Sequence, residues 1–429
     1  MIIVTLADIK NYLCKKNFSM KYTILSFFLL IIITSCSTKK AVQNGTTPLS
    51  EKANLLAQKY IIVDGHVDLP YRLKVKNFRL EKEYVGIPVQ SDKGDFDFVR
   101  ARKGGLDAPF MSIYLPASKQ KEEGASKALA DTLINMIEYI AKENSDKFMI
   151  AHKPQDVEKA FAAGKVALPM GMENGSGLEN DLANVAYFNK RGISYITLTH
   201  SKVNLICDSS YDTIRTWNGL SPFGEDVVKE MNRVGIMVDI SHVSDSTFWD
   251  VMKITTLPVI ASHSSVRKYV PDFERNMADD MITEMGRNGG VIMVNFGSTF
   301  IDGNITIERD KRRDVLRKLL DDKNVTGDSE EGKIIIKKFE AEYPNIYSDV
   351  QKVVDHIDHI VKLAGVDHVG FGSDYDGVGD SLPTGLKDVS DYPNLIEELL
   401  KRGYSEEDVS KMCYKNLFRV WNAVERAGI

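Results

Sequence analysis

The residues with the clearest chemical potential are His66 and Asp68, which stand two positions apart in the chain. They follow a short apolar run, residues 60–63, which is typical of a buried strand that leads into a loop containing Gly65. In an extended backbone, positions i and i+2 point to the same face, so an imidazole and a carboxylate can reach one cation. Alone, the pair also fits a strand-end His beside a solvated Asp, so its meaning depends on the rest of the chain.

Further ionisable side chains stand at or just after the ends of other apolar, β-rich runs. The complete set is His66, Asp68, Glu173, His200, His242, His263 and Asp374, which contains four of the eight histidines in the chain. If these runs are parallel strands of one barrel, residues at their carboxyl ends share one mouth, however far apart they are in sequence. Burying such groups together costs many kcal/mol, and a divalent cation is the simplest compensation.

This set supplies nitrogen and oxygen donors only, and the chain contains no Cys-x-x-Cys pair that would suggest a thiolate zinc site. Such donors suit zinc or a similar first-row metal in a site that leaves room for water. The candidate ligands exceed the needs of one zinc ion. We therefore expect two metal ions that share a bridging carboxylate, an arrangement that hydrolyses acyl and phosphoryl bonds.

The elements that must position these residues alternate between strands and helices. Apolar runs rich in β-formers predict strands at 60–64, 109–115, 166–172, 193–199, 235–241, 258–262, 290–296 and 368–373. Helical periodicity fills several of the stretches between them, including 128–140, 224–234 and 246–253. The alternation predicts an α/β fold with a parallel sheet, and the number of strands predicts a (β/α)8 TIM-like barrel.

Residues 301–351 break this alternation, because the segment is long and highly charged. It contains helical patches at 311–320 and 333–342, separated by residues 324–328. An ordinary connection between strand and helix is much shorter. The segment follows the seventh predicted strand, so it is either a lid over the site or a solvated decoration.

The N-terminal region predicts export rather than part of the fold. Met20 and Lys21 precede an apolar run, residues 24–33, that is too short for a confident membrane span and resembles a secretory signal. Residues 33–36 resemble a bacterial lipobox, in which Cys36 becomes lipidated. We therefore expect an over-extended start and a signal peptide in 1–36, a polar tether in 37–50, and a single domain in 51–429. The mature protein would be exported and lipid-anchored to a bacterial membrane, on the periplasmic or cell-surface side.

The composition argues against nucleic-acid binding, and the four remaining histidines are not expected to belong to the site. A net charge of −5 with scattered basic residues gives no footprint for nucleic acid. His356 and His359 have a spacing that could bind metal, but they lie on a predicted helix before the eighth strand. Such a helix belongs to the outer ring of a barrel, so we expect structural packing there. His152 and His368 carry no signal of function.

Several motifs of the chain resemble, in order, those of the membrane dipeptidase family, also called renal dipeptidase. They are VDGHVDLP (63–70), GMENG (171–175), YITLTHS (195–201), VDISHVS (238–244), VIASHSS (259–265), ERNMADD (274–280) and VGFGSDYDGV (369–378). The resemblance runs from about residue 61 to the C-terminus, nearly the whole predicted mature chain. It implies a barrel of the metal-dependent hydrolase type with two zinc ions, although another divalent metal is compatible.

The resemblance also implies a role for each ligand residue. His66 and Asp68 would hold one zinc ion, and His242 and His263 the other. Glu173 would bridge them. Many related barrel hydrolases use a carboxylated lysine as the bridge, so a glutamate at this position favours the dipeptidase branch.

The resemblance implies roles for three further residues in the hydrolysis of dipeptides by a metal-bridging hydroxide. His200 would lie in the substrate pocket and donate to the carbonyl oxygen as it becomes an oxyanion. Arg275 would bind the free carboxylate of the dipeptide, although it could instead pair with Asp279 or Asp280. Asp374 would pass a proton to the leaving amine. We expect short dipeptides as substrates, with tolerance of a D-residue at the second position.

The chain also departs from the family pattern. Cys207 and Cys413 do not reproduce the paired cysteines of animal members, so a disulfide-linked dimer does not carry over, although a homodimer stays compatible. Two other functions stay open. One is a related dinuclear barrel hydrolase that acts on N-acyl amino acids, lactones or phosphoesters. The other is a non-catalytic surface lipoprotein that binds peptides or metal.

Overall fold

The computed structural model describes residues 48–75 and 86–428, and these described residues belong to one compact unit. The predicted lipidation site Cys36 and the predicted export signal lie outside the described residues. Within the described part of the chain, no helix is both long and apolar enough to cross a membrane.

Eight strands close into a barrel in the spatial order β1, β10, β9, β8, β7, β6, β5, β2. They are β1 (Ile62–Val67), β2 (Leu106–Tyr114), β5 (Met170–Glu173), β6 (Ile193–Thr197), β7 (Met237–Asp239), β8 (Ile260–Ala261), β9 (Val291–Val294) and β10 (Val369–Phe371). Neighbouring barrel strands are parallel, and β1 pairs with both β2 and β10, which closes the ring. The predicted (β/α)8 barrel is confirmed.

The prediction of a single third strand at 166–172 is wrong, because this range forms two separate strands. Its first part is β4 (Val166–Leu168), which pairs with β3 (Phe148–Ile150) in a separate two-stranded sheet. Its second part is β5, a barrel strand. The two parts meet at Pro169, which has no backbone N–H to donate to a strand ladder, while its carbonyl accepts from Met111 N. The proline therefore marks the point at which the chain changes sheets.

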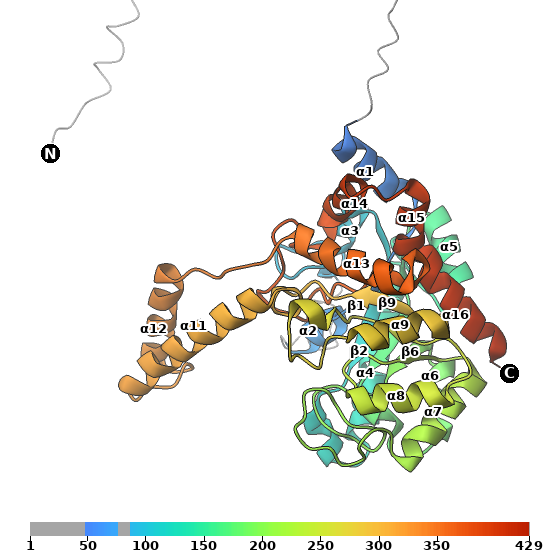
Figure 1. Ribbon diagram of the computed structural model, residues 1–429, viewed down its shortest axis with the longest axis horizontal. Helices are drawn as coiled ribbons and strands as arrows, with labels where there is room; N and C mark the ends of the chain where they lie inside the picture. The colour runs from blue at the N-terminus through green and yellow to red at the C-terminus, as the bar shows by residue number, and fades with distance from the viewer. Residues whose placement is uncertain (1–47, 76–85, 429) are drawn as a thin grey trace, which may run out of the picture. The chain divides into compact units, whose positions relative to one another are not determined.

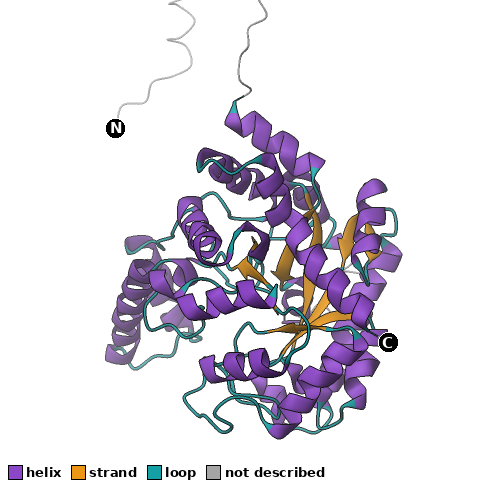
Figure 2. Cartoon of the chain, turned by 45° about the vertical axis from the view of Figure 1, so that its right-hand side comes forward, coloured by secondary structure: helices purple, strands orange, loops and turns teal. Residues whose placement is uncertain are grey.

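Helices occupy most of the connections between barrel strands and surround the barrel (Figure 2). They are α1 (Leu49–Lys59), α2 (Leu69–Val75), α3 (Phe98–Gly104), α4 (Ala125–Glu143), α5 (Pro154–Ala162), α6 (Ala183–Lys190), α7 (Pro222–Val234), α8 (Asp245–Ile254), α9 (Asp279–Asn288), α10 (Ser298–Ile301), α11 (Gly303–Asp322), α12 (Glu330–Glu342), α13 (Val350–Ala364), α14 (Tyr392–Lys401), α15 (Glu406–Ser410) and α16 (Asn416–Ala427). The three helical stretches expected from periodicity fall within α4, α7 and α8. Apart from α11 and α12, these helices form a ring that buries the apolar outer face of the strands (Figure 1).

The charged segment 301–351 folds mainly as the helix pair α11 and α12, which lies apart from the strands (Figure 1). Both predicted helical patches are part of this pair. Its own small core includes Phe339, which packs against Arg312 and Tyr343. Several of its apolar side chains, such as Val315 and Ile334, are exposed.

Candidate active site

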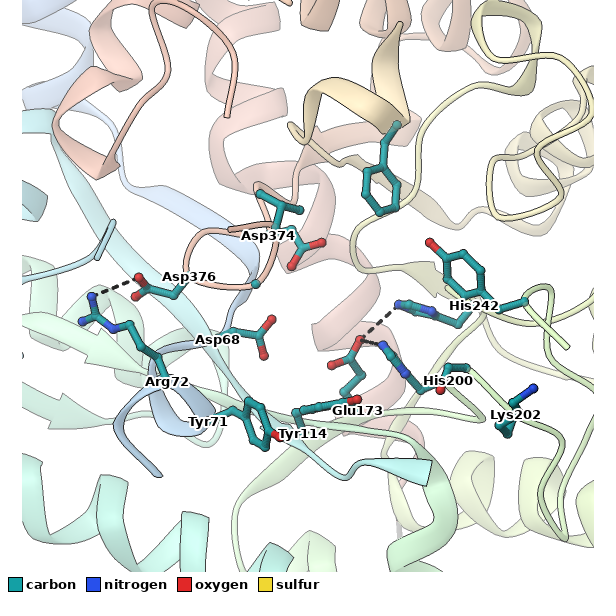
Figure 3. Close-up of a pocket in the computed structure, with 15 residues that line it drawn as sticks. Asp68, Tyr71, Arg72, Tyr114, Glu173, His200, Lys202, His242, Asp374 and Asp376 are labelled. Carbon is teal, nitrogen blue, oxygen red and sulfur yellow. Dashed lines mark ion pairs between the residues drawn. The ribbon is translucent and has the colours of Figure 1, made fainter. Parts of the chain in front are cut away.

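The seven ionisable residues expected at strand ends converge at one end of the barrel. Five of them line a cavity of about 750 Å³: Asp68, Glu173, His200, His242 and Asp374. The other two, His66 and His263, are buried and lie against Glu173. Figure 3 shows Asp68, Glu173 and Asp374 facing the same space, with His200 and His242 directed toward Glu173. Among the described residues that line this cavity, none belongs to segment 301–351.

Local backbone conformation aims these side chains. His66 lies inside β1 rather than in the loop that the sequence suggested, because β1 continues to Val67. Gly65 is required there, since a Cβ would stand 2.4 Å from Ser262 O and 2.6 Å from Met293 Sδ. His242 and Asp374 adopt left-handed backbone angles, with φ of 67° and 63°. Such conformations cost free energy and cluster at functional sites, where surrounding structure enforces them.

Glu173 is the centre of the cluster, and its two oxygens face different partners. Oε1 lies 3.1 Å from His242 Nε2 and 3.3 Å from His263 Nε2. Oε2 lies 3.5 Å from His66 Nε2, which is 3.4 Å from Asp68 Oδ2. Burial would raise the pKa of Glu173, but the surrounding imidazoles hold it well below its usual range. The carboxylate is therefore ionised and stands between two pairs of donors.

The donor set fits one or more divalent cations. His242 Nε2 and His263 Nε2 are 2.8 Å apart, and the rings of His66 and His263 stack at 3.8 Å. Among the described residues, His66 Nε2 and Asp68 Oδ1 are buried without a hydrogen-bond partner. Buried polar atoms without protein partners are costly, so these two atoms fit a role as metal ligands. Nitrogen and carboxylate oxygen are the donors that zinc accepts.

Asp374 lies beside this donor set without contacting Glu173. Its Oδ2 accepts a hydrogen bond of 2.8 Å from Asn295 Nδ2, and its backbone N–H donates to His66 O. Burial raises the pKa of Asp374 to about 8. Gly377 leaves space for the carboxyl groups of Asp374 and Asp68, because a Cβ at residue 377 would lie within 2.2 Å of an oxygen of each. A buried carboxyl of this kind can hold or release a proton in the cavity.

His200 forms part of an aromatic wall of the cavity. Its ring packs edge-on against Tyr114 at 4.7 Å, and Tyr114 packs against Tyr71 at the same distance. Burial lowers the pKa of His200, so its imidazole is neutral. His200 Nε2 is 3.8 Å from Glu173 Oε1, outside hydrogen-bond distance. The N–H of this ring can therefore donate a hydrogen bond to a molecule bound in the cavity.

Arg275 is buried next to the cavity but does not line it. Its Nη1 donates to Ser264 Oγ and its Nη2 to His263 O, both at 2.7 Å. Its guanidinium lies 5.7 Å from the ring of Phe300, which does line the cavity. In the described part of the chain it forms no ion pair with Asp279 or Asp280; Asp279 pairs with His359 instead.

Several residues that support the site were not singled out by the sequence analysis. Tyr195 and Ser262 contact the outer nitrogens of His66 and His263. Asp376 turns away from the donor cluster to pair with Arg72 at 3.1 Å (Figure 3). Tyr195 and Ser262 do fall within the quoted motifs, but nothing in their spacing distinguishes them from ordinary strand residues.

Two histidines lie on α13, as expected for the outer ring. His356 is bonded to Val266 N and Ile301 O, and His359 to Lys268 and Asp279. They take no part in the cavity.

A closed (β/α)8 barrel with a carboxylate surrounded by imidazoles at one end of its strands defines a metal-dependent hydrolase. A family model described as membrane dipeptidase, peptidase family M19, matches residues 50–428. Dipeptidase tcpJ of Claviceps purpurea (strain 20.1) is 33% identical over 369 residues, covering 84% of this chain and 76% of that protein. The chain belongs to the membrane dipeptidase family and is a metal-dependent dipeptidase.

Solved structures agree on the fold. The probable dipeptidase PvdM from Pseudomonas aeruginosa gives a TM-score of 0.74 at 24% identity, covering 89% of this chain and 99% of that chain. A metallo peptidase from Rhodobacter sphaeroides, liganded with a phosphinate mimic of the dipeptide L-Ala-D-Ala, gives 0.68 at 22% identity, covering 85% and 99%.

Proposed function

We propose that this chain hydrolyses the peptide bond of dipeptides, including L-D dipeptides, with the help of two zinc ions. The observation that carries the proposal is the position of Glu173, whose Oε1 faces His242 and His263 while Oε2 faces His66. A carboxylate placed between two donor pairs matches a bridging ligand. The inclusion of L-D dipeptides draws support from the dipeptide mimic bound to the Rhodobacter sphaeroides relative.

In this proposal, His66 and Asp68 would hold one zinc ion, His242 and His263 would hold the other, and Glu173 would contribute to both. When bound, the zinc ions would polarise the scissile carbonyl and lower the pKa of a water molecule. The protein keeps these donors in a mostly buried pocket, where charged interactions are stronger than in water.

His200 and Asp374 act on the substrate from opposite sides of the cluster. The neutral imidazole of His200 donates an N–H to the carbonyl oxygen as negative charge develops on it. Asp374 would accept the proton of the attacking water on Oδ1, because Oδ2 already accepts from Asn295. It transfers this proton to the nitrogen of the leaving amine. No side chain needs to attack the substrate.

Arg275 is the proposed receptor for the free carboxylate of the dipeptide. Each of its Nη atoms keeps a second N–H beyond the bonds to Ser264 and His263, and its Nε has no partner among the described residues. A carboxylate that approaches past Phe300 could take up these donors. This contact would restrict the enzyme to short substrates with a free C-terminus.

A panel of substrates tests the proposal. Zinc-loaded protein should hydrolyse L-Ala-L-Ala and L-Ala-D-Ala, lose this activity on chelation, and regain it with zinc. N-acetyl-alanine and a simple lactone test the alternative of a related barrel hydrolase. A metal-replete protein that is inert toward every dipeptide would overturn the proposal, and the alternative of a peptide- or metal-binding protein would then be favoured.

We also propose that the protein is exported and anchored to a membrane by a lipid on Cys36. The support is the lipobox-like sequence at residues 33–36. Expressed in a bacterial host, the full chain should fractionate with membranes, and Cys36→Ala should appear in a soluble exported fraction. Membrane association that survives this substitution would contradict the lipid anchor.

A further inference from the structure

Two buried hydroxyl groups contact the nitrogens of His66 and His263 that face away from Glu173. Tyr195 Oη lies 3.0 Å from His66 Nδ1, and it donates its own proton to Gly65 O at 3.0 Å. A hydroxyl has only one proton to donate. Because that proton is committed to a carbonyl, the oxygen can only accept from His66, which places a proton on Nδ1.

Ser262 repeats this arrangement at His263. Its Oγ donates to Asp239 Oδ2 at 2.6 Å, and Ser262 N donates to Asp239 Oδ1 at 2.8 Å. Ser262 Oγ also lies 2.7 Å from His263 Nδ1. A carboxylate accepts hydrogen bonds only, so the serine proton points to Asp239 and its oxygen accepts from His263 Nδ1–H. The neutral ring then has a free lone pair on Nε2, the atom that faces Glu173.

His242 has no such hydroxyl. In the described part of the chain its Nδ1 is buried without a partner. Its Nε2 lies 2.8 Å from His263 Nε2 and 3.1 Å from Glu173 Oε1, and both of these atoms are acceptors. His242 therefore lacks the outer contact that orients the other two rings.

We propose that Tyr195 and Ser262 are positioning residues that fix His66 and His263 in the tautomer required for metal binding. The inference rests on the proposed metal centre, in which Nε2 of each ring is the ligand atom. Hydrogen bonds to the outer nitrogen of metal-bound histidines orient the ring and raise its basicity. Two of the three rings have this outer contact, whereas Nδ1 of His242 has no partner among the described residues.

The first test needs no variant. Nitrogen-15 NMR of histidine-labelled protein reports which ring nitrogen carries a proton, with and without added zinc. We expect His66 and His263 to keep the Nδ1 proton in both states. An unprotonated Nδ1 on His66 or His263 in either state would overturn the proposal.

The second test measures zinc affinity by competition with a chelator. Tyr195→Phe and Ser262→Ala should each weaken zinc binding about 10- to 100-fold, and Ser262→Thr, which keeps the hydroxyl, should recover most of the loss. Matched controls are Tyr375→Phe, whose hydroxyl contacts Leu386 O, and Ser265→Ala, whose hydroxyl contacts Asn295 O. Both controls remove a buried hydroxyl that touches none of the proposed ligands, so their zinc affinity should stay close to wild type.

Unchanged zinc affinity in Tyr195→Phe and Ser262→Ala, or an equal loss in the controls, would contradict the proposal. Denaturant unfolding of the metal-free variants separates this role from simple destabilisation. These readouts differ from those of the proposed function, because they do not use hydrolysis. A protein that binds zinc as described but cleaves no dipeptide would retain this inference and lose the proposed function.

Discussion

Two groups of buried histidines in this protein have the same chemistry and different surroundings. At the barrel mouth, His66, His242 and His263 turn Nε2 toward Glu173 and toward one another. On α13, His356 is equally buried, but Val266 N donates to its Nδ1 and its Nε2 donates to Ile301 O, both at 2.9 Å. The mouth therefore leaves nitrogen atoms available for a ligand, whereas α13 uses both nitrogens of His356 to hold the backbone.

The difference shows that burial of a histidine does not reveal its role, while the partners of its two nitrogens do. A ring with both nitrogens bonded to backbone has its hydrogen-bonding capacity filled, and its removal costs stability. A ring with one nitrogen directed at other acceptors lacks a hydrogen-bond partner for that nitrogen, and a cation can supply the missing interaction. Substitutions in the two groups should thus have opposite effects on function and stability.

The largest expected effect is that of His66→Ala. Hydrolysis of L-Ala-D-Ala should fall by about 10⁴-fold or more, because one proposed metal position loses a ligand. Metal analysis should show the loss of one zinc ion, and the circular dichroism spectrum should stay that of a folded barrel. Retained activity with a full complement of metal would place His66 with the structural histidines.

Asp374→Asn should lower kcat by about 10²- to 10³-fold, because the amide cannot transfer a proton to the leaving amine. Zinc content should remain that of the wild type, since Asp374 is not a proposed ligand. Steady-state kinetics and metal analysis on the same preparation check both statements. Unchanged kcat would remove Asp374 from the mechanism.

His356→Ala should lower the free energy of unfolding by about 3 kcal/mol, because it leaves Val266 N–H and Ile301 C=O without partners and opens a cavity. Zinc affinity and kcat of the folded variant should stay close to wild type. Denaturant unfolding and chelator competition measure the two quantities. A large loss of zinc affinity at unchanged stability would contradict the structural role of His356 and place it with the histidines at the barrel mouth.

Lowering the pH should reduce the free energy of unfolding through the same residue, by a smaller amount. Burial lowers the pKa of His356 from 6.5 to about 4, so between these values the unfolded chain binds a proton that the folded protein does not. The contribution of neutral His356 to the free energy of unfolding is therefore present above pH 6.5 and is lost as the pH falls toward 4. From pH 6.5 to about pH 5, the wild type should lose about 2 kcal/mol more than His356→Ala. Parallel pH profiles of the two proteins would contradict this assignment.

The sequence predicted the barrel and the convergence of the cluster because both follow from local patterns. Short apolar runs separated by helices determine the topology, and a parallel barrel brings residues at the ends of strands together. The change of sheet at Pro169 was not predicted, because a continuous apolar run hides which strand each half pairs with. The proline was the available signal.

The supporting contacts of the site were not predictable in the same way. Tyr195 contacts His66 across 129 positions of sequence, and this contact depends on the register of β1 and β6 in the closed barrel. The role of Arg275 also depends on folding detail, because both its Nη atoms already donate within the protein. The predicted dizinc ligands, the substrate contacts and the lipid anchor remain predictions.

The most direct test of the account is a metal titration of the purified protein with L-Ala-D-Ala hydrolysis measured at each step. The account predicts no activity after chelation, full activity at about two zinc ions per chain, and no gain beyond that ratio. Full activity in metal-free protein, or saturation at a single zinc ion per chain, would contradict a two-metal centre built around Glu173.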